Sequence, residues 1–308
     1  MKILVTGGAG YIGSVLVPKL LAEDHHVTVI DSLLFGSQGM IQSFYSKNFN
    51  FVKGDVRDEK LMASLVAGAD LIIHLAAYVG YPICKKFPKE AEETNLGASL
   101  MLNKLRGSTP ILFGSTGSNY GQVTEICTEE TPLNPITLYG TTKTGAERAF
   151  VDSGNQICYR FATAFGPSPR LRLDLLINDF CNRAVTLKSL IVYEAEFRRT
   201  FIHIEDIANS FMHAIANYDS MKDEVYNVGS NDMNFTKAEI ARLIQQKVDY
   251  YLHFADVGQD EDQRDYEVDY TKFASTGFKT KWSMDDGLDQ TISVISTLSQ
   301  ERSSYSNV

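Results

Sequence analysis

Long apolar runs, dense runs of basic residues and closely spaced cysteines are all missing from this sequence, and each absence excludes a class of protein. The first apolar run, residues 2–6, stops at glycines far too early for a signal peptide or a membrane span. No fixed-period repeat or low-complexity tract appears. We therefore expect a cytoplasmic protein with no membrane partner.

The charge of the chain argues against a nucleic-acid partner. Its 29 Lys and Arg residues are outnumbered by 38 Asp and Glu residues, which gives a net charge of −9. DNA or RNA would be repelled by this surplus instead of releasing counterions to a basic surface. A small or nucleotide-linked ligand is the better expectation.

The four cysteines, Cys84, Cys127, Cys158 and Cys181, are widely spaced and form no C-x-x-C pair. Such spacing favours reduced, buried thiols over a zinc site or a disulfide framework, and we expect no metal. The 308 residues, 44% of them apolar, suffice for one large or two modest domains without cross-linking by metal ions or disulfides.

Short β-branched runs alternate with helical patterns through the first half of the chain. We expect buried strands at residues 2–6, 27–31, 50–53, 71–75, 110–113 and 157–160, and helices at residues 12–23, 59–67, 90–105 and 139–153. Strict alternation predicts right-handed crossovers and a parallel sheet covered on both faces. The expected fold class is α/β: a Rossmann-type doubly wound sheet with a smaller C-terminal substrate-binding region.

After residue 167 the alternation loosens, although two more strand-like runs follow at residues 200–204 and 224–228. We therefore predict a first domain over residues 1–167, to which the chain returns near residues 200–230. Residues 168–199 and 231–308 are expected to form the substrate-binding region.

A glycine-rich turn links the first expected strand to the first expected helix. Gly8, Gly10 and Gly13 fit the pattern G-x-G-x-x-G, and Gly7, Gly10 and Gly13 fit the wider spacing G-x-x-G-x-x-G. Without side chains the backbone can approach a pyrophosphate, whose charge meets the N–H groups at the helix N-terminus. Glycine-rich turns also serve plain tight packing, so the pattern alone is a weak signal.

The residue that ends the second strand strengthens this prediction. Asp31 follows the turn by about 20 residues, as the dinucleotide fingerprint requires. A carboxylate there accepts hydrogen bonds from both adenosine ribose hydroxyls and repels a 2′-phosphate, which favours NAD over NADP. The alternative is a turn residue that caps the next segment.

Two later strand ends supply further cofactor candidates. Asp55 could bond to the adenine amino group while Val56 backs the ring, although Asp55 could equally cap the helix that begins near Glu59. His74 is expected to be a packing histidine. The small residues that would lie under a cofactor ribose are Leu75, Ala76 and Ala77.

Tyr139 and Lys143 lie one helical turn apart at the start of a helix, so the ammonium can lie close to the phenol. A phenol with a pKa of roughly 10 is a poor base at neutral pH. The cation, a positive nicotinamide and the helix N-terminus can together lower that pKa. In isolation, Tyr-x-x-x-Lys is a common surface pair.

The loop after residue 113 offers the hydroxyls of Ser115, Thr116 and Ser118. One of them could hold a reacting sugar oxygen while Tyr139 takes its proton and a hydride passes to NAD. The plain alternative is a polar connection, although functional residues usually lie on such loops.

Several motifs follow one another along nearly the whole chain: TGGAGYIG, the strand-ending Asp31, the loop before Tyr120-Gly121, YGTTK, RFATAFGP and RRTFIHIEDIA. Together they resemble the extended short-chain dehydrogenase/reductase superfamily, in particular its NAD-dependent nucleotide-sugar epimerases and dehydratases. The resemblance implies an NAD cofactor, a nucleotide-diphosphate sugar as substrate, and a homodimer formed through helices near residues 95–105 and 139–153.

The same resemblance implies a role for each matching residue. Tyr139 becomes the base, Lys143 its pKa partner and ribose ligand, and Thr116 the hydroxyl that binds the reacting oxygen. The implied cofactor contacts are Gly7, Gly10, Tyr11, Ile12, Gly13, Asp31, Asp55, Val56, Leu75, Ala76, Ala77 and Lys143. The implied substrate contacts are Ser115, Thr116, Thr163, Arg170, Arg172, Asn178, Arg199 and Arg264.

Two departures from the family pattern bear on the reaction. Family dehydratases carry an Asp-Glu pair directly after the Ser/Thr, where Gly117 and Ser118 stand here. Dehydration is therefore disfavoured, as is the decarboxylase variant that needs a Glu there. Thr163 replaces the usual Asn of the R-x-x-N-x-x-G-P run, which normally contacts the substrate.

Residues 79–85 and 168–180 resemble a narrower subgroup that includes NAD-dependent C4 dehydrogenases of GDP-linked heptoses. In this subgroup Arg170 and Arg172 would belong to the sugar or phosphate pocket, since a guanidinium suits phosphate. The alternative for them, as for Arg199 and Arg264, is an ordinary surface charge.

The function implied is hydride removal at C4 of a nucleotide-linked sugar. If the hydride returns to the other face of the ketone, the protein is a 4-epimerase like the UDP-glucose 4-epimerases; if the ketone leaves, it is a C4 dehydrogenase. A dinucleotide sensor without chemistry is the alternative from another class. Such relatives typically lose the Tyr or the Lys, and both are present here.

Overall fold

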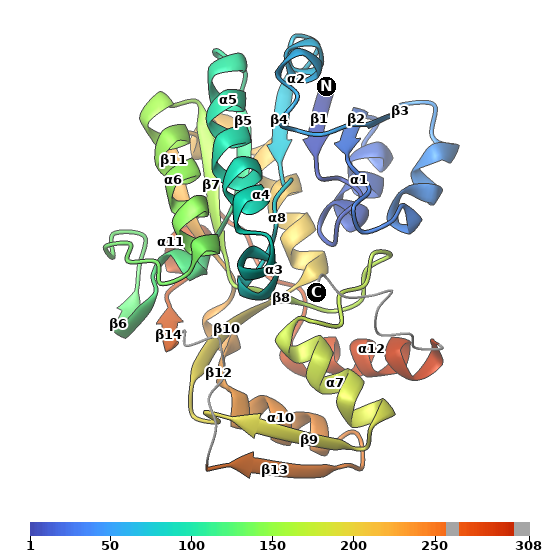
Figure 1. The fold of residues 1–308 in the computed structure, drawn as a ribbon, viewed down its shortest axis with the longest axis vertical. Helices are drawn as coiled ribbons and strands as arrows, with labels where there is room; N and C mark the ends of the chain where they lie inside the picture. The colour runs from blue at the N-terminus through green and yellow to red at the C-terminus, as the bar shows by residue number, and fades with distance from the viewer. Residues whose placement is uncertain (257–264, 299–308) are drawn as a thin grey trace.

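A seven-stranded parallel sheet forms the centre of the structure, a computed structural model that describes residues 1–256 and 265–298 (Figure 1). The strand order is β11-β7-β5-β4-β1-β2-β3, and every neighbouring pair runs parallel. The strands are β1 (Lys2–Thr6), β2 (His26–Asp31), β3 (Phe49–Lys53), β4 (Leu71–His74), β5 (Ile111–Thr116), β7 (Gln156–Phe161) and β11 (Glu224–Val228). The predicted α/β, Rossmann-type fold class is therefore confirmed.

The strands form where apolar runs can be buried on both faces. Every residue of β4 and of β7 is buried, as parallel strands between two helical layers require. Along β1, Leu4 packs with one helical layer while Ile3 and Val5 pack with the other, because successive side chains point to opposite faces.

Helices cover both faces of the sheet. On one face α1 (Gly13–Ala22) packs against α8 (Ile204–Ala216). On the other face lie α2 (Glu59–Val66), α5 (Ala98–Leu105) and α6 (Leu138–Ser153), which share an apolar core. This arrangement leaves the carboxyl ends of the strands as the edge at which a site can form.

The single helix predicted at residues 90–105 is built in three pieces. After α3 (Tyr81–Lys86) and α4 (Pro88–Glu92), a π-helical turn spans Glu93–Gly97 and leads into α5. In this turn Asn95 accepts a hydrogen bond from the backbone N–H of Tyr78 at 2.7 Å and donates one to its carbonyl at 3.0 Å. Apolar periodicity alone does not reveal such a turn, which is often found near functional sites.

Of the two strand-like runs predicted near residues 200–230, only the second joins the main sheet. β10 (Arg198–His203) lies instead in a separate three-stranded sheet, between β8 (Thr163–Phe165) and β12 (Asn234–Thr236). α8 and β11 then bring the chain back, because β11 takes the edge place beside β7. The domain limits at residues 167, 199 and 231 stay predictions.

A second apolar core lies below the main sheet in Figure 1, among the later elements. These elements are α7 (Leu176–Thr186), β9 (Ser189–Tyr193), α10 (Lys237–Gln245), β13 (Tyr251–Ala255) and α12 (Met284–Thr297). The described residues also form β6 (Gln122–Cys127), β14 (Asp265–Val268), α9 (Tyr218–Met221), α11 (Thr271–Ala274) and 3₁₀ helices at Gln38–Tyr45, Gly117–Asn119 and Asn231–Met233.

All four cysteines are free and buried, as the sequence predicted. Over residues 1–256 and 265–298, no helix is both long enough and apolar enough to cross a membrane. Within the same residues, no group of three or more His, Cys, Asp and Glu side chains could hold a metal ion.

Candidate functional site

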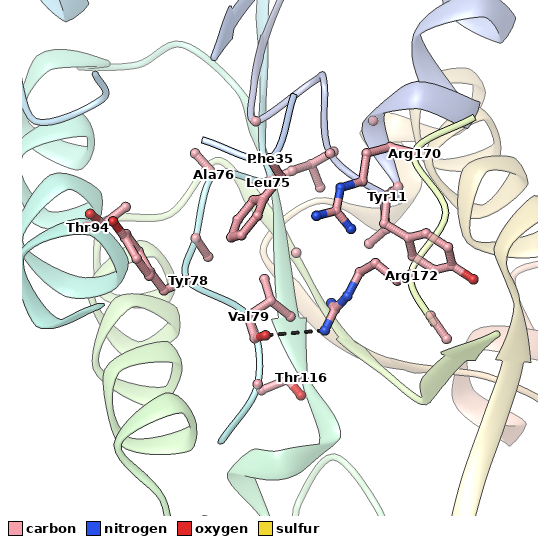
Figure 2. Close-up of a pocket in the computed structure, with 18 of the residues that line it drawn as sticks. Tyr11, Phe35, Leu75, Ala76, Tyr78, Val79, Thr94, Thr116, Arg170 and Arg172 are labelled. Carbon is pink, nitrogen blue, oxygen red and sulfur yellow. Dashed lines mark hydrogen bonds between the residues drawn. The ribbon is translucent and has the colours of Figure 1, made fainter. Parts of the chain in front are cut away.

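One large cavity opens at the carboxyl ends of the main-sheet strands (Figure 2). It lies where the strand order changes direction, with β2 on one side of β1 and β4 on the other, the usual ligand position in such sheets. Its lining includes nearly all of the predicted site residues: Gly7, Gly10, Tyr11, Ile12, Gly13, Asp31, Asp55, Val56, Leu75, Ala76, Ala77, Ser115, Thr116, Tyr139, Lys143, Thr163, Arg170 and Arg172.

Two glycines of the glycine turn differ in their surroundings: one is tightly packed and the other faces the cavity. Gly7 has φ +70°, and an added Cβ would lie 2.6 Å from the backbone nitrogen of Ala76, so only glycine fits. At Gly10 an added Cβ would meet only the carbonyl oxygen of Gly7, at 3.2 Å. Gly7 is therefore explained by packing, whereas Gly10 leaves the backbone accessible from the cavity.

Asp31 lies at the end of β2 and already bonds to backbone on both sides. Its carboxylate accepts hydrogen bonds from the N–H groups of Ala9 at 3.0 Å and Leu33 at 2.8 Å. Burial raises the pKa of Asp31, and these two bonds oppose that rise. Each oxygen keeps lone-pair capacity for a further donor from the cavity, so the capping and ligand-binding interpretations are compatible.

Asp55 is not the cap of α2, so that alternative was wrong. Asp58 takes this place: its side chain accepts from Leu61 N at 3.1 Å, since it directly precedes the first helical residue. Asp55 faces Arg57, whose Nη2 lies 2.7 Å from the carboxylate and whose hydrogen bonds lower the pKa of Asp55. Asp55 lines the cavity instead.

His74 is a packing histidine, as predicted. It is 1% exposed, and its ring nitrogens pair with Thr6 Oγ1 at 2.7 Å and Ser99 Oγ at 3.0 Å. Burial lowers its pKa to about 3, so the ring stays neutral. The hydroxyl of Thr6 also accepts from the N–H groups of Leu75 and Ala76, which fixes the backbone below the cavity.

Helix α6 carries Tyr139 and Lys143 on the face that lines the cavity. The helix begins beside the cavity because the side chain of Thr137 caps it, accepting from Gly140 N at 3.1 Å. Lys143 is 3% exposed, with Nζ 4.0 Å from the centroid of the Phe113 ring. Burial lowers the pKa of Lys143 to about 7, and Glu147, one turn further on, opposes that change.

Thr116 and Ser118 form a pair of hydroxyls on the cavity wall after β5. Thr116 Oγ1 donates to Ser118 Oγ at 3.1 Å and accepts from Ser118 N at 3.2 Å. The neighbouring Ser115 instead donates to Glu147 Oε2 at 2.5 Å, behind the cavity wall. Of the candidate hydroxyls, Thr116 is therefore better placed than Ser115 to meet a ligand.

Two predicted substrate residues, Asn178 and Arg199, do not line the cavity. Asn178 is fully buried, and its amide bonds to Gly166, Arg172 and the phenol of Tyr11. Arg199 is 1% exposed within β10 and donates to the carbonyl of Arg198 at 2.9 Å. Arg264 lies outside the described residues.

Several cavity residues were missed by the sequence analysis, among them Phe35, Tyr78 and Tyr266. Tyr266 arrives because β14 pairs with β6, a contact between segments far apart in the chain. Its hydroxyl lies 3.2 Å from where a Cβ on Gly117 would be. No local pattern signals such a pairing, so Tyr266 could not be found from the sequence.

The chain is similar to several known proteins. The chain matches the NAD dependent epimerase/dehydratase family over residues 3–229. A low-salt glycan biosynthesis protein, Agl12 of Haloferax volcanii, is 33% identical over 94% of this chain and 96% of its own length. A UDP-glucose 4-epimerase of Halalkalibacterium halodurans is 31% identical over 80% of each chain.

Among solved structures, a UDP-glucose 4-epimerase of Thermotoga maritima with UDP-glucose is 25% identical. The similarity covers 95% of this chain and 98% of that one, with a TM-score of 0.82. A family match over more than half of the chain and two relatives above 30% identity together show the family. This chain is a member of the NAD-dependent epimerase/dehydratase family.

Proposed function

We propose that this protein oxidises C4 of a nucleotide-linked sugar with NAD. The observation that carries the proposal is the shared cavity wall of Thr116, Ser118, Tyr139 and Lys143 beside the glycine turn. Positions 117 and 118 hold Gly117 and Ser118, so no carboxylate stands there to eliminate water from the sugar. Reversible oxidation at C4 needs only the groups that are present.

The residues of the cavity fit a dinucleotide. The open backbone at Gly10 and the N-terminus of α1 suit its diphosphate. The lone-pair capacity of Asp31 suits the adenosine ribose hydroxyls, and Asp55 with Val56 suits the adenine. NAD, when bound, would accept the hydride that leaves C4.

Tyr139 is the proposed base, which takes the proton of O4, while the hydroxyl of Thr116 binds the same oxygen. Lys143 supplies the positive charge that favours the tyrosinate. Because burial lowers the pKa of Lys143 to about 7, its charge is marginal at neutral pH. A neighbouring tyrosinate would favour the charged lysine, so each group supports the ionised form of the other.

Thr163 and Arg172 are the proposed substrate-side residues of the cavity. Asn178 is proposed to act indirectly, since it fixes Gly166 and the phenol of Tyr11. For Arg199 the same indirect role is proposed, because its side chain is buried away from the cavity.

A 4-epimerase and a C4 dehydrogenase share all these residues up to the ketone. The UDP-glucose 4-epimerases among the relatives support the first. The resemblance of residues 79–85 and 168–180 to C4 dehydrogenases of GDP-linked heptoses supports the second. We propose the epimerase as the leading function.

Product analysis on a panel of UDP- and GDP-sugars, GDP-heptose included, tests the proposal. An inverted sugar without net NADH identifies the epimerase, and stoichiometric NADH with a 4-keto sugar identifies the dehydrogenase. Loss of water or of CO₂ from the sugar would contradict the proposed reaction. Tight binding of NADH without turnover of any sugar would favour the sensor.

Replacing Tyr139 by Phe is expected to lower kcat by about 10²- to 10⁴-fold, because general base catalysis contributes that much. The Kd for NADH should change little, because the phenol is not needed to hold the dinucleotide. Tyr45→Phe is the matched control, since Tyr45 is 87% exposed on the Gln38–Tyr45 helix. Unchanged turnover in Tyr139→Phe would disprove the mechanism.

The family resemblance also implies a homodimer, and we propose the outer faces of α5 and α6 as its interface. The two helices pack side by side, and each exposes an apolar side chain, Leu100 and Val151, at 40%. Leu100→Glu should convert dimer to monomer in size-exclusion chromatography with light scattering. Ile191→Glu, on β9, is the matched control.

A further inference from the structure

Arg170 and Arg172 reach into the cavity from the segment that follows β8. They are 5% and 7% exposed, although both carry long cationic side chains. Figure 2 shows the guanidinium of Arg170 extending toward Phe35 and that of Arg172 toward Val79. Both were expected in the substrate pocket, so the direction of Arg170 needs its own explanation.

The backbone that carries Arg170 is fixed to the glycine turn and the start of α1. Ser168 Oγ donates to the carbonyl of Tyr11 at 2.8 Å and lies 2.8 Å from Ser14 Oγ. The N–H of Arg170 donates to Ser14 Oγ at 3.4 Å. The phenol of Tyr11 donates to the carbonyl of Gly166 at 2.5 Å. The arginine therefore has a set position relative to the helix N-terminus.

The head of Arg170 lies near the end of β2, on the side of the cavity where Asp31 is. Its guanidinium carbon is 4.8 Å from the centroid of the Phe35 ring. The charges of Asp31 and Arg170 interact, since Arg170 lowers the pKa of Asp31. Arg172 has a different environment: it pairs with Asp174 at 2.6 Å and reaches the carbonyl of Val79 at 3.4 Å.

The buried guanidinium groups of Arg170 and Arg172 repel each other, and the nearby carboxylates of Asp174 and Asp31 oppose that repulsion only in part. Burial, and then the charge of Arg172, lower the pKa of Arg170 to about 10. A diphosphate in the cavity would offset both effects, because it offers several charged oxygens to a planar fork of donors.

We propose that Arg170 binds the diphosphate of the dinucleotide from the side opposite the N-terminus of α1. The assignment rests on the proposed function, which makes NAD the cofactor. A diphosphate is also present in a nucleotide sugar, so the chemistry alone allows two sources. The attachment to Tyr11 and Ser14 and the proximity to Asp31 favour the dinucleotide.

In this arrangement the cofactor is held by two parts of the chain. The helix N-terminus comes from the first crossover, and Arg170 comes from the segment after β8, on the way to α7. Bound dinucleotide would then stabilise the position of residues 166–172, which also carry Arg172 at the cavity wall. Arg170 is thus a cofactor ligand that the glycine fingerprint does not reveal.

Isothermal titration of the full chain with ADP-ribose, NADH, UDP and GDP tests the assignment. Arg170→Gln should weaken ADP-ribose and NADH by about tenfold or more while UDP and GDP bind as in the wild type, since one charge-assisted contact is lost. Arg170→Lys should be intermediate, because it keeps the charge without the planar fork. Arg242→Gln, exposed on α10, is the matched control.

A second readout separates a ligand from a merely structural residue. The affinity of ADP-ribose should fall with added salt more steeply in the wild type than in Arg170→Gln, because one screened contact is missing from the variant. Unchanged ADP-ribose affinity in Arg170→Gln, or a loss confined to UDP and GDP, would overturn the assignment. If the wild type itself bound neither ADP-ribose nor NADH, the proposed function would fail, and the role of Arg170 with it.

Discussion

Lys143 lies beside the ring of Phe113, and burial lowers the pKa of its ammonium from 10.5 to about 7. The unfolded chain takes up a proton as the pH falls through 10.5, whereas the folded chain does so only near 7. The lysine therefore destabilises the folded state increasingly as the pH falls from 10.5 to 7, and by a constant amount below. A residue proposed for catalysis thus weakens the ligand-free fold.

Replacing Lys143 by Met is expected to abolish turnover and to stabilise the ligand-free protein by roughly 4 kcal/mol at pH 7, since the pKa is lowered from 10.5 to about 7 and each pKa unit corresponds to about 1.4 kcal/mol. Urea unfolding at pH 7 and pH 9.5 measures the effect, which should be smaller at the higher pH. Lys104→Met, at an exposed position on α5, is the control and should change neither quantity. A less stable Lys143→Met variant would contradict the argument.

Individual residues could be assigned from the sequence where a backbone pattern fixes them. The glycine turn, Asp31 and the Tyr139–Lys143 pair all line the cavity because strand ends and one helical turn determine their positions. Asp55 could not be told from a helix cap, because Asp58 lies only three residues further on. The burial of Arg199 depends on what packs against β10, which no local pattern records.

A buried ion pair joins α6 to β7 next to the end of β5. Glu147 and Arg160 approach to 2.7 Å with side chains 2% and 7% exposed. Glu147 also accepts from Ser115 and Asn119, and Arg160 donates to the phenol of Tyr120 at 3.0 Å. The pair therefore fixes the end of β5, which carries Thr116, to the helix that carries Tyr139.

Removing one member of this pair should cost more than removing both. Glu147→Gln is expected to destabilise the protein by about 3 kcal/mol, because it leaves the charge of Arg160 buried and uncompensated. The double variant Glu147→Gln with Arg160→Met should recover part of that loss in urea unfolding. A double variant less stable than the single one by the full cost of a second independent loss would show that the two residues are not coupled.

The same substitution should also move the pH dependence of turnover. Glu147 raises the pKa of Lys143, so its neutralisation lets that pKa fall further. The lysine then loses its charge at a lower pH, and the alkaline limb of kcat should shift toward acid in Glu147→Gln. If the alkaline limb of the pH–rate profile did not move in the variant, ionisation of Lys143 would not be the cause of that limb.

Most elements of the main sheet could be predicted, because buried parallel strands are continuous apolar runs that alternate with amphipathic helices. What failed depends on contacts between distant segments. Asn95 in the π turn at Glu93–Gly97 accepts a hydrogen bond from the backbone of Tyr78. β10 pairs with β8 and β12 in the small sheet, while β11 takes the place beside β7. The pairing of β14 with β6 likewise brings Tyr266 to the cavity without a local signal.

At the scale of the whole molecule, each of the two cores has a buried neutral histidine at its edge. His74 lies between β1 and α5, where it bonds to Thr6 and Ser99. His203 lies between the small sheet and α12, stacked 4.1 Å from the Trp282 ring and paired with Gln290 at 3.0 Å. Burial lowers the pKa of His74 to about 3 and that of His203 to about 4.

Acid is therefore expected to destabilise both parts of the molecule at once. Below pH 6.5 the unfolded chain binds a proton at each histidine while the folded chain does not, so stability present above pH 6.5 is lost as the pH falls toward 4. Each histidine should contribute about 1.4 kcal/mol of loss per pH unit in that window. Asp31 and Asp206, whose carboxyl pKa values burial raises, act in the opposite sense and are common to wild type and variants.

Urea unfolding at pH 7, 6 and 5 measures this contribution. Wild type should lose stability faster than His74→Gln or His203→Gln, and the double variant should have the shallowest dependence, because it removes both proton-binding sites from the unfolded chain. His26→Gln is the control, because His26 is exposed at the start of β2. If the stability of the double variant depended on pH as that of the wild type does, acid would unfold the protein through its carboxylates instead. The two buried rings would then not contribute to acid unfolding.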